Sequence, residues 1–183
     1  GKQDIATPNY SFNSVSIRLG DGVGGFTAMS SIPVGINPIS IAIGDLNQNG
    51  FQDIVVANFQ SFYVSVLLGN GLGGFFATSN VSVGDYPYSI VLSDFNADGK
   101  LDISTANFGS NNISVCLGIG MGLFNPASNF TCGNGPRSIA TGDFNGDGNN
   151  DLVTANYSSN SVSILIGDGS GGFSVPFDIS VGI

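Results

Sequence analysis

Short apolar runs alternate with polar, glycine-rich segments along the whole chain. Residues 40–46, 53–58, 63–69 and 75–84 form one group of such runs, rich in Val, Ile and Phe and bounded by Gly, Asn or Pro. Runs of this length and composition predict β-strands. Some runs are apolar at both odd and even positions, which indicates a sheet covered on both faces. No segment shows the 3.6-residue periodicity of a capped helix.

The strand pattern repeats with a period of 49 residues. The segments GDLNQNGFQDIVVAN, SDFNADGKLDISTAN and GDFNGDGNNDLVTAN begin at Gly44, Ser93 and Gly142. The opening residues GKQDIATPN match the second half of this segment and align Asp4 with Asp53. A fixed period near 50 residues is typical of propellers, solenoids and arrays, and four short strands per unit are typical of a propeller blade.

We therefore predict an all-β chain of four-stranded antiparallel propeller blades, three complete and one without its first strand. The predicted units of this single repeat domain, residues 1–183, are residues 1–36 (the partial unit), 37–85, 86–134 and 135–183. A fourth complete unit would need 13 more residues. We therefore expect an excerpt of a longer repeat protein, either part of a closed propeller or a stretch of an open array.

The charged residues restrict the function. Four Lys and Arg residues stand against thirteen Asp, with no Glu and no His, and the net charge is −9. This charge argues against a nucleic-acid partner, which needs a basic surface. The absence of His and Glu removes the commonest general acids and bases, so we expect no enzymatic activity. No apolar run approaches the ~18 residues of a membrane span, so we predict no membrane insertion.

Oxygen-bearing side chains recur in a loop of each complete unit, and we number the loop positions from its first Asp. Positions 1, 3, 5 and 9 are Asp45, Asn47, Asn49 and Asp53 in the first loop, Asp94, Asn96, Asp98 and Asp102 in the second, and Asp143, Asn145, Asp147 and Asp151 in the third. A glycine follows position 5 each time and permits a sharp bend, and position 7 (Phe51, Lys100 or Asn149) offers its backbone carbonyl. Ca²⁺ takes six to eight such oxygens. The sequence thus predicts about three Ca²⁺ sites, with Lys2 and Asp4 left from a partial fourth.

The loops have two other interpretations. The spacing resembles the start of an EF-hand, but the loop closes at position 9 with Asp and is flanked by strands, which excludes an EF-hand. An Asx-rich turn, in which carboxylates cap the loop's own amides, explains one or two Asp residues per turn. Eight of the thirteen Asp residues lie in the three loops, where without a cation they would repel one another. Three bound Ca²⁺ ions would reduce the net charge from −9 to −3, and we favour calcium.

The motif D-x-[ND]-x-[ND]-G-x-x-D followed by an apolar strand resembles the FG-GAP (VCBS-type) repeats of integrin α-subunit β-propellers and their microbial and invertebrate relatives. The resemblance covers essentially the whole chain. It implies that each repeat is a blade, with the calcium loop joining the first two strands on one face of the disc. It also implies an extracellular or cell-surface protein with a role in adhesion, recognition or scaffolding, and seldom a catalytic one.

Two other recurring features have structural interpretations. Glycine strings such as LGDGVGGF, from Leu19 to Phe26, are followed by a strand, so they predict hairpin turns and not a dinucleotide-binding loop. An Asn recurs at the end of the second strand, and we favour its side chain bonding the turn backbone over a ligand role. These residues are Asn9, Asn58, Asn107 and Asn156.

Arg18 stands where the other units have Leu67, Cys116 and Leu165. A charge at this position indicates either a blade face that is less covered, as at the end of an array, or an Arg that reaches the rim. Both interpretations remain open on the sequence.

The two cysteines are predicted not to form a disulfide. A hairpin pairing Leu117 with Phe124 would put Cys116 opposite Asn125 and leave Cys132 roughly 20 Å away along the sheet. A disulfide needs Cα atoms within about 7 Å.

Five N-x-S/T sequons are present. Asn80 and Asn129 share one place on the predicted outermost strand and are the main glycosylation candidates, with Asn112 as a third. Asn9 and Asn156 are predicted to be structural.

Together these features predict a non-enzymatic, extracellular, calcium-binding propeller segment for adhesion, recognition or scaffolding. Its partners would be a protein or glycan ligand, or further copies of itself. The alternatives are a structural subunit of a glycosylated extracellular filament or matrix, and an ancillary module of a carbohydrate-active enzyme.

Overall fold

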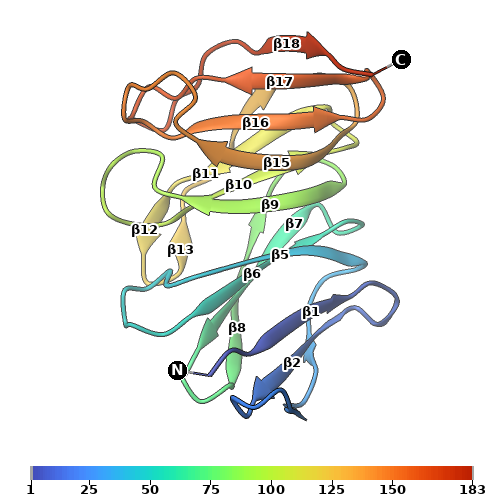
Figure 1. Cartoon of the computed structure of the whole chain (residues 1–183), viewed down its shortest axis with the longest axis vertical. Helices are drawn as coiled ribbons and strands as arrows, with labels where there is room; N and C mark the ends of the chain where they lie inside the picture. Colours follow the sequence, from blue (N-terminus) through green and yellow to red (C-terminus); the bar gives the residue numbers. More distant parts are fainter. Residues whose placement is uncertain (1, 183) are drawn as a thin grey trace.

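The computed structural model describes residues 2–182. Within this range the chain forms four antiparallel sheets of four strands, which follow one another in chain order along the long axis of the molecule (Figure 1). The only helical element among these residues is a single 3₁₀ turn, η1 (Tyr10–Phe12), and none is a helix able to cross a membrane. The all-β class predicted from the strand pattern is confirmed.

The sheets are named first to fourth. The first contains β1 (Ile5–Asn9), β2 (Ser14–Gly20), β3 (Phe26–Ala28) and β4 (Ile32–Pro33); the second contains β5 (Pro38–Gly44), β6 (Asp53–Asn58), β7 (Tyr63–Gly69) and β8 (Phe75–Ser82). The third contains β9 (Pro87–Ser93), β10 (Asp102–Asn107), β11 (Asn112–Cys116) and β14 (Ser128–Thr131), beside a hairpin of β12 (Gly118–Gly120) and β13 (Leu123–Phe124). The fourth contains β15 (Pro136–Gly142), β16 (Asp151–Asn156), β17 (Ser161–Leu165) and β18 (Phe177–Ser180).

The apolar core lies between consecutive sheets. In β6 every residue is buried, and successive side chains point to opposite faces. Val55 packs in the cluster shared with the third sheet, whereas Ile54 and Val56 pack in the cluster shared with the first. A third cluster joins the third and fourth sheets. The prediction that the sheets are covered on both faces therefore holds for the inner sheets.

Strand boundaries differ from the sequence prediction at two places. The first strand of the second sheet starts at Pro38, which pairs with Asn58 across a bulge, and ends at Gly44 because the acidic loop begins at Asp45. Among the outer strands of the four sheets, only β8 is long and unbroken. In the third sheet the outer strand is divided into β13 and β14 around Pro126, which has no N–H to donate to a ladder.

The cysteine register was predicted wrongly, although the conclusion holds. Phe124 pairs with Gly118 instead of Leu117, and Val115 pairs with Ser128. A register irregularity in the β12–β13 hairpin and the strand break that follows it shift the outer strand, so Cys116 is not opposite Asn125. Both cysteines are free, as predicted.

Arg18 is exposed, whereas Leu67, Cys116 and Leu165 at the equivalent positions are fully buried. Leu67 packs in the cluster between the first and second sheets, so by strand register Arg18 points to the outer face of the first sheet. Both interpretations of this charge stay predictions.

Candidate metal centre

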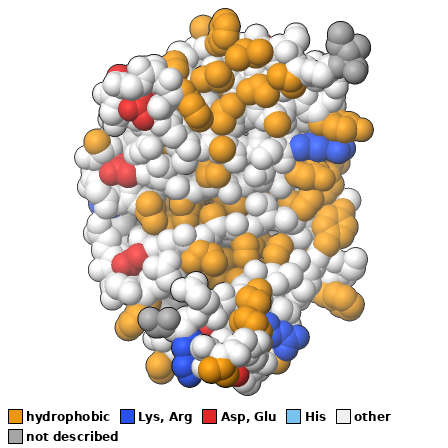
Figure 2. Space-filling model, in the orientation of Figure 1, with side chains coloured by type: hydrophobic (Ala, Val, Ile, Leu, Met, Phe, Trp, Pro, Cys, Tyr) orange, Lys and Arg blue, Asp and Glu red, His pale blue; other side chains and the backbone are white. Residues whose placement is uncertain are grey.

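The three acidic loops lie on one side of the stack, each between the first two strands of its sheet (Figure 1). Figure 2 shows acidic side chains at three heights along this edge. Neighbouring loops are in contact, because Gln48 Nε2 donates to the Gly99 carbonyl at 2.9 Å and Asn150 Nδ2 donates to the Asp94 carbonyl at 2.8 Å. The loops therefore form one connected ridge.

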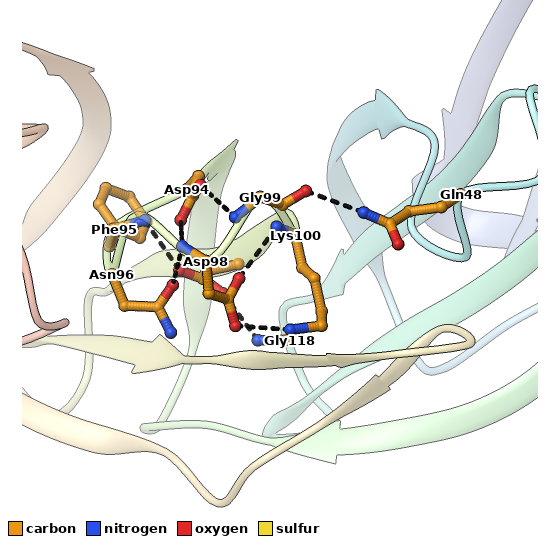
Figure 3. Close-up of polar contacts among 9 residues, drawn as sticks. Gln48, Asp94, Phe95, Asn96, Asp98, Gly99, Lys100 and Gly118 are labelled. Carbon is orange, nitrogen blue, oxygen red and sulfur yellow. Dashed lines mark hydrogen bonds and ion pairs between the residues drawn. The ribbon is translucent and has the colours of Figure 1, made fainter.

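Inside the second loop, side-chain oxygens turn inward onto the loop's own amides (Figure 3). Asp94 accepts N–H bonds from Asp98 at 3.2 Å and from Gly99 at 2.8 Å. Asn96 Oδ1 accepts a second bond from the Asp98 amide at 3.2 Å, and Asp98 Oδ1 accepts one from the Lys100 amide at 2.9 Å. Gly99 has a φ of +80°, the left-handed conformation that the predicted bend requires.

The first and third loops repeat this arrangement. Asp45 accepts from Asn49 and Gly50, and Asp143 accepts from Asp147 and Gly148, at 2.7–3.1 Å. These are the bonds of an Asx-rich turn, so the capping interpretation describes part of the loop correctly. It does not oppose the calcium interpretation, because each carboxylate has about four lone-pair sites and an amide oxygen has two.

Position 9 has a role that the sequence did not reveal. Asp53, Asp102 and Asp151 are fully buried. In each, Oδ2 accepts the N–H of loop position 2, at 2.8–2.9 Å. Oδ1 accepts the N–H of a glycine just after or at the end of the third strand, at 2.7–2.8 Å. This carboxylate thus joins the loop, the second strand and the third strand. In the sequence, the signal for this role is the glycine that recurs 16 residues after each of these Asp residues.

The electrostatics of the second loop reflect its crowding. Burial raises the pKa of Asp102, an effect that its two backbone hydrogen bonds oppose and that the nearby carboxylates of Asp94 and Asp98 reinforce. A hydrogen bond from the Lys100 side chain lowers the pKa of Asp98, and Lys100 Nζ lies 2.7 Å from Asp98 Oδ2. In the third loop, a hydrogen bond from the Asn145 side chain lowers the pKa of Asp147.

In the first two loops, position 2 connects the loop to the next sheet. The Leu46 carbonyl accepts a bond from the Gly122 amide at 3.3 Å, and the Phe95 carbonyl accepts one from the Gly171 amide at 3.1 Å. The Leu46 and Phe95 side chains are buried between sheets, whereas Phe144 is 51% exposed because no described sheet follows the fourth. Loop geometry and sheet stacking are therefore coupled.

Sequence comparison decides the family. Profiles of the FG-GAP-like repeat match residues 1–56, 45–105 and 94–154, and a profile of the FG-GAP repeat matches residues 135–174. The chain belongs to the FG-GAP repeat family. No curated protein matches the sequence.

Solved structures similar to this FG-GAP chain include a protein from Lactobacillus plantarum, with a TM-score of 0.73 and 16% identity over 98% of the chain and 53% of that protein. The periplasmic gluconolactonase of Pseudomonas aeruginosa has a TM-score of 0.69 and 17% identity, over 98% of this chain and 52% of the gluconolactonase. An Agrocybe aegerita lectin specific for non-reducing terminal N-acetylglucosamine has a TM-score of 0.65 and 19% identity, over 97% of this chain and 49% of the lectin. The likeness is one of fold, and the chain spans about half the length of these structures.

The donor set of each FG-GAP loop fits a hard cation. Within residues 2–182, no group of three or more His, Cys, Asp or Glu side chains could hold a metal alone, so Asn and carbonyl oxygens must complete any site. All predicted donors are oxygens, which favours Ca²⁺ over metals that select nitrogen or sulfur. In the partial fourth loop, Asp4 Oδ1 accepts the Gly20 amide at 2.8 Å, as Asp53 accepts Gly69, but Asp4 is exposed.

The recurring Asn at the end of the second strand is structural. Asn58, Asn107 and Asn156 are buried, and each Nδ2 donates to a serine of the third strand at 2.7–3.0 Å. The side-chain amide of each Asn therefore bonds chiefly to a serine hydroxyl and not, as was predicted, to the turn backbone. Asn58 Nδ2 also donates to the Tyr63 carbonyl.

The glycosylation candidates differ in exposure. Asn80 and Asn129 are exposed on the outer strands β8 and β14, whereas Asn112 is partly buried. Asn80 Oδ1 and Asn129 Oδ1 accept bonds from Ser65 and Ser114. A glycan is attached through Nδ2, so these two bonds could persist beneath it.

Aromatic residues gather at the ends of the second strands that lie away from the acidic loops, a feature that was not predicted from the sequence. The Arg137 guanidinium carbon lies 3.6 Å from the ring centre of Tyr157, 5.3 Å from Phe108 and 5.5 Å from Tyr88. Phe59 continues the row, with its ring centre 5.8 Å from Tyr88. Figure 2 shows hydrophobic side chains along the edge away from the acidic loops. The available signal was the Phe or Tyr that follows each recurring Asn.

The coupling between loop and sheet can be tested with two phenylalanines at equivalent positions. Phe95→Ala is expected to lower the free energy of unfolding by about 3–5 kcal/mol, because it empties a buried site between two sheets. Phe144→Ala is the matched control and should change it by less than about 1 kcal/mol, because Phe144 is half exposed. Urea denaturation measures both, and equal losses would contradict the role of position 2 in stacking.

Proposed function

We propose that the chain is a non-enzymatic, extracellular FG-GAP segment that binds about three Ca²⁺ ions and presents a rigid surface for recognition or adhesion. The observation that carries the proposal is the threefold occurrence of one loop in which the oxygens of positions 1, 3 and 5 converge on the loop backbone above a buried Asp. Random acidic turns would not share this geometry.

Calcium would act as a structural clamp. The oxygens of positions 1, 3 and 5, with the carbonyl of position 7 and the carboxylate of position 9, would hold the ion. Its charge would offset the repulsion among three carboxylates in the second and third loops. Because loop position 2 is bonded both to the position 9 Asp and to the next sheet, a rigid loop supports the stack.

An extracellular setting agrees with the calcium affinity expected of such loops and with the low reactivity of the two thiols. Extracellular calcium modules bind at about 10⁻⁴–10⁻³ M, within reach of weak, partly exposed loops. Burial raises the pKa of Cys116 to about 12 and that of Cys132 to about 11. Both thiols are therefore poor nucleophiles, which suits an oxidising environment.

The aromatic row around Arg137 is the best candidate for the recognition surface. Tyr, Phe and Arg are enriched where proteins bind partners, because they supply large contact areas with a polar end. Tyr157 is 62% exposed, so the part of its ring that Arg137 does not cover is available to a ligand. A glycan or protein ligand fits this chemistry, and the similar lectin recognises a terminal N-acetylglucosamine.

Calcium titration tests the proposed function. Isothermal titration calorimetry should give about three ions per chain, and Asp94→Ala should remove one of them by deleting two oxygen donors. Asp21→Ala is the control, because Asp21 accepts bonds only within its own glycine turn, and it should leave three. Absence of calcium heat, or equal stoichiometry in wild type and Asp94→Ala, would contradict the proposal.

One observation favours the second candidate, a subunit of an array of serial repeats. Val153, Val162 and Ile164 in the fourth sheet stand where Val55, Val64 and Val66 are buried against the third sheet, yet no described sheet covers them. Further along the same face, Ile179 is 41% exposed and Val181 is 46% exposed. An apolar face built like an internal interface suits a continuing array.

We expect the fourth sheet to drive concentration-dependent association. Ile164→Asp should shift the chain toward monomer in light scattering coupled to size exclusion, because it places a charge on that face. Leu72→Asp, in the exposed turn between β7 and β8 of the second sheet, is the control and should associate like wild type. A wild-type chain that stays monomeric at its highest soluble concentration would count against the array.

A further inference from the structure

The aromatic row around Arg137 continues along the second sheet through two residues with an unusual backbone conformation. Phe62, in the turn between β6 and β7, has a φ of +57°, and Tyr86, in the linker between β8 and β9, has a φ of +55°. Their ring centres lie 5.5 Å apart, edge to face, and the Tyr86 ring centre lies 5.0 Å from that of Phe59. The row therefore spans the second, third and fourth sheets.

The other repeat units have residues that suit this conformation at the same two positions. They are Asn13, Asn111 and Asn160 at the position of Phe62, and Asn37 and Gly135 at the position of Tyr86, all with positive φ. A bulky side chain is strained at positive φ, and such strain gathers at ligand-binding sites. Phe62 is 44% exposed and Tyr86 is 38% exposed, so burial does not explain their presence. Two exposed rings in strained positions indicate a binding role.

Arg137 adds a positive charge to the row. It is exposed, and its guanidinium stacks on the Tyr157 ring. Among residues 2–182 the single ion pair joins Lys100 to Asp98, so Arg137 has no carboxylate partner. A guanidinium that stacks on a ring still presents N–H groups along its edge, and their fork geometry matches a carboxylate. The missing partner is therefore a carboxylate from outside the chain.

The charge balance favours a ligand with one carboxylate. Arg137 is the only Lys or Arg in the row, and the chain carries a net charge of −9. Asp85, which directly precedes Tyr86, is exposed and adds a negative charge near the row. A polyanion would therefore be repelled, whereas one carboxylate is matched by one guanidinium.

The backbone along the row favours a sugar over an extended peptide. The amides of Phe59, Phe108 and Tyr157 already donate to carbonyls of the preceding linkers, each at 2.9 Å. An extended peptide gains affinity from free main-chain groups, which these turns do not offer. A sugar ring needs none, because its apolar face stacks on an aromatic ring. Its hydroxyls can bond to the Tyr86 and Tyr157 hydroxyls.

We propose that the aromatic row binds an oligosaccharide that ends in a single carboxylated sugar. The acidic sugar would lie beside Arg137 and Tyr157, and the neutral sugars would follow the row past Tyr88 toward Tyr86 and Phe62. This inference names a ligand class for the recognition role proposed above and rests on that role. It does not depend on calcium.

Nuclear magnetic resonance titration of the full chain with 3′-sialyllactose tests the proposal. The chain has only two arginines, so the Arg137 side-chain N–H signal should shift saturably while that of Arg18 stays unchanged. Lactose, which lacks the carboxylate, should bind about 10- to 100-fold more weakly, and Arg137→Gln should weaken sialyllactose binding by the same factor. Asp85→Asn should strengthen it, because a like charge is removed.

Substitutions at the strained positions separate binding from folding. Phe62→Asn and Tyr86→Asn introduce the residue found in other units and should each weaken sialyllactose binding about 5- to 10-fold. Neither should lower the melting temperature, because Asn adopts positive φ at less cost. Phe12→Asn is the control, because Phe12 is an 83% exposed aromatic residue of η1 outside the row, and it should leave binding unchanged.

Three outcomes would overturn the proposal. They are an unshifted Arg137 signal, equal affinity for lactose and sialyllactose, and tighter binding of a polyuronate or of an acidic proline-rich peptide. If the loops bind calcium but no sugar binds, only this inference fails. If sialyllactose binds and calcium does not, only the calcium function fails.

Discussion

Chelation of calcium with EGTA is expected to lower the melting temperature of the chain. A ligand bound only by the folded state stabilises it by about 2.7 kcal/mol at a concentration 100 times its Kd, so three filled sites would contribute up to about 8 kcal/mol. For a chain of this size, each kcal/mol corresponds to about 2–4 °C. We therefore expect a shift above about 10 °C between saturating Ca²⁺ and EGTA, measured by circular dichroism or scanning calorimetry.

Two controls make this result specific. Mg²⁺ at the same concentration should restore little of the loss, because it demands a tighter octahedral geometry than an irregular loop provides. A variant with Asp45, Asp94 and Asp143 all changed to Ala should melt at the same temperature with and without Ca²⁺. An unchanged melting temperature for the wild-type chain in EGTA would refute the calcium clamp.

Asp102→Ala is expected to destabilise the chain even when calcium is absent. The change leaves the buried amides of Phe95 and Gly118 without an acceptor, and each orphaned amide costs about 1–3 kcal/mol. The expected loss of unfolding free energy in EGTA is therefore about 2–6 kcal/mol by urea denaturation. The change also removes the cost of burying the Asp102 carboxylate, whose pKa is raised by that burial. We therefore expect a loss of unfolding free energy toward the lower end of this range.

Asp98→Ala is the matched control in the same loop. Its carboxylate accepts only exposed bonds, from the Lys100 amide and side chain, and an exposed ion pair contributes little to stability because solvent screens it. In EGTA this variant should therefore lose little stability, while in Ca²⁺ it should lose the contribution of one site. Equal losses of unfolding free energy for the two variants in EGTA would show that the hydrogen bonds of the position 9 Asp do not stabilise the fold.

Much of the architecture was readable from the sequence because it depends on local patterns that recur. Apolar runs of strand length, bounded by Gly, Asn and Pro, predicted the strands, and the 49-residue period predicted identical sheets. The period also aligned Asp45 with Asp94 and Asp143, so the loops could be identified by comparing the chain with itself. The FG-GAP family follows from the same recurring motif, and the profiles confirm it.

Side-chain partners across the sheet could not be read in this way. Asp102 could be identified as a loop residue, but its bond to Gly118 depends on the pairing of the second and third strands. Arg137 and Tyr157 are 20 positions apart in the chain, and only the pairing of β15 with β16 brings them together. The cysteine register failed for a related reason, because a bulge and Pro126 shift the outer strand where the pattern alone implies a regular hairpin.

The sequence by itself therefore determined the element types, the repeat and the oxygen-rich loops, because these depend on composition and spacing along the chain. Tertiary structure alone decided that the position 9 Asp is buried and hydrogen-bonded to two backbone amides, and that position 2 couples the first two loops to the next sheet. Each of these facts depends on which backbone amides and which sheet faces meet in space, and a sequence period does not specify such meetings.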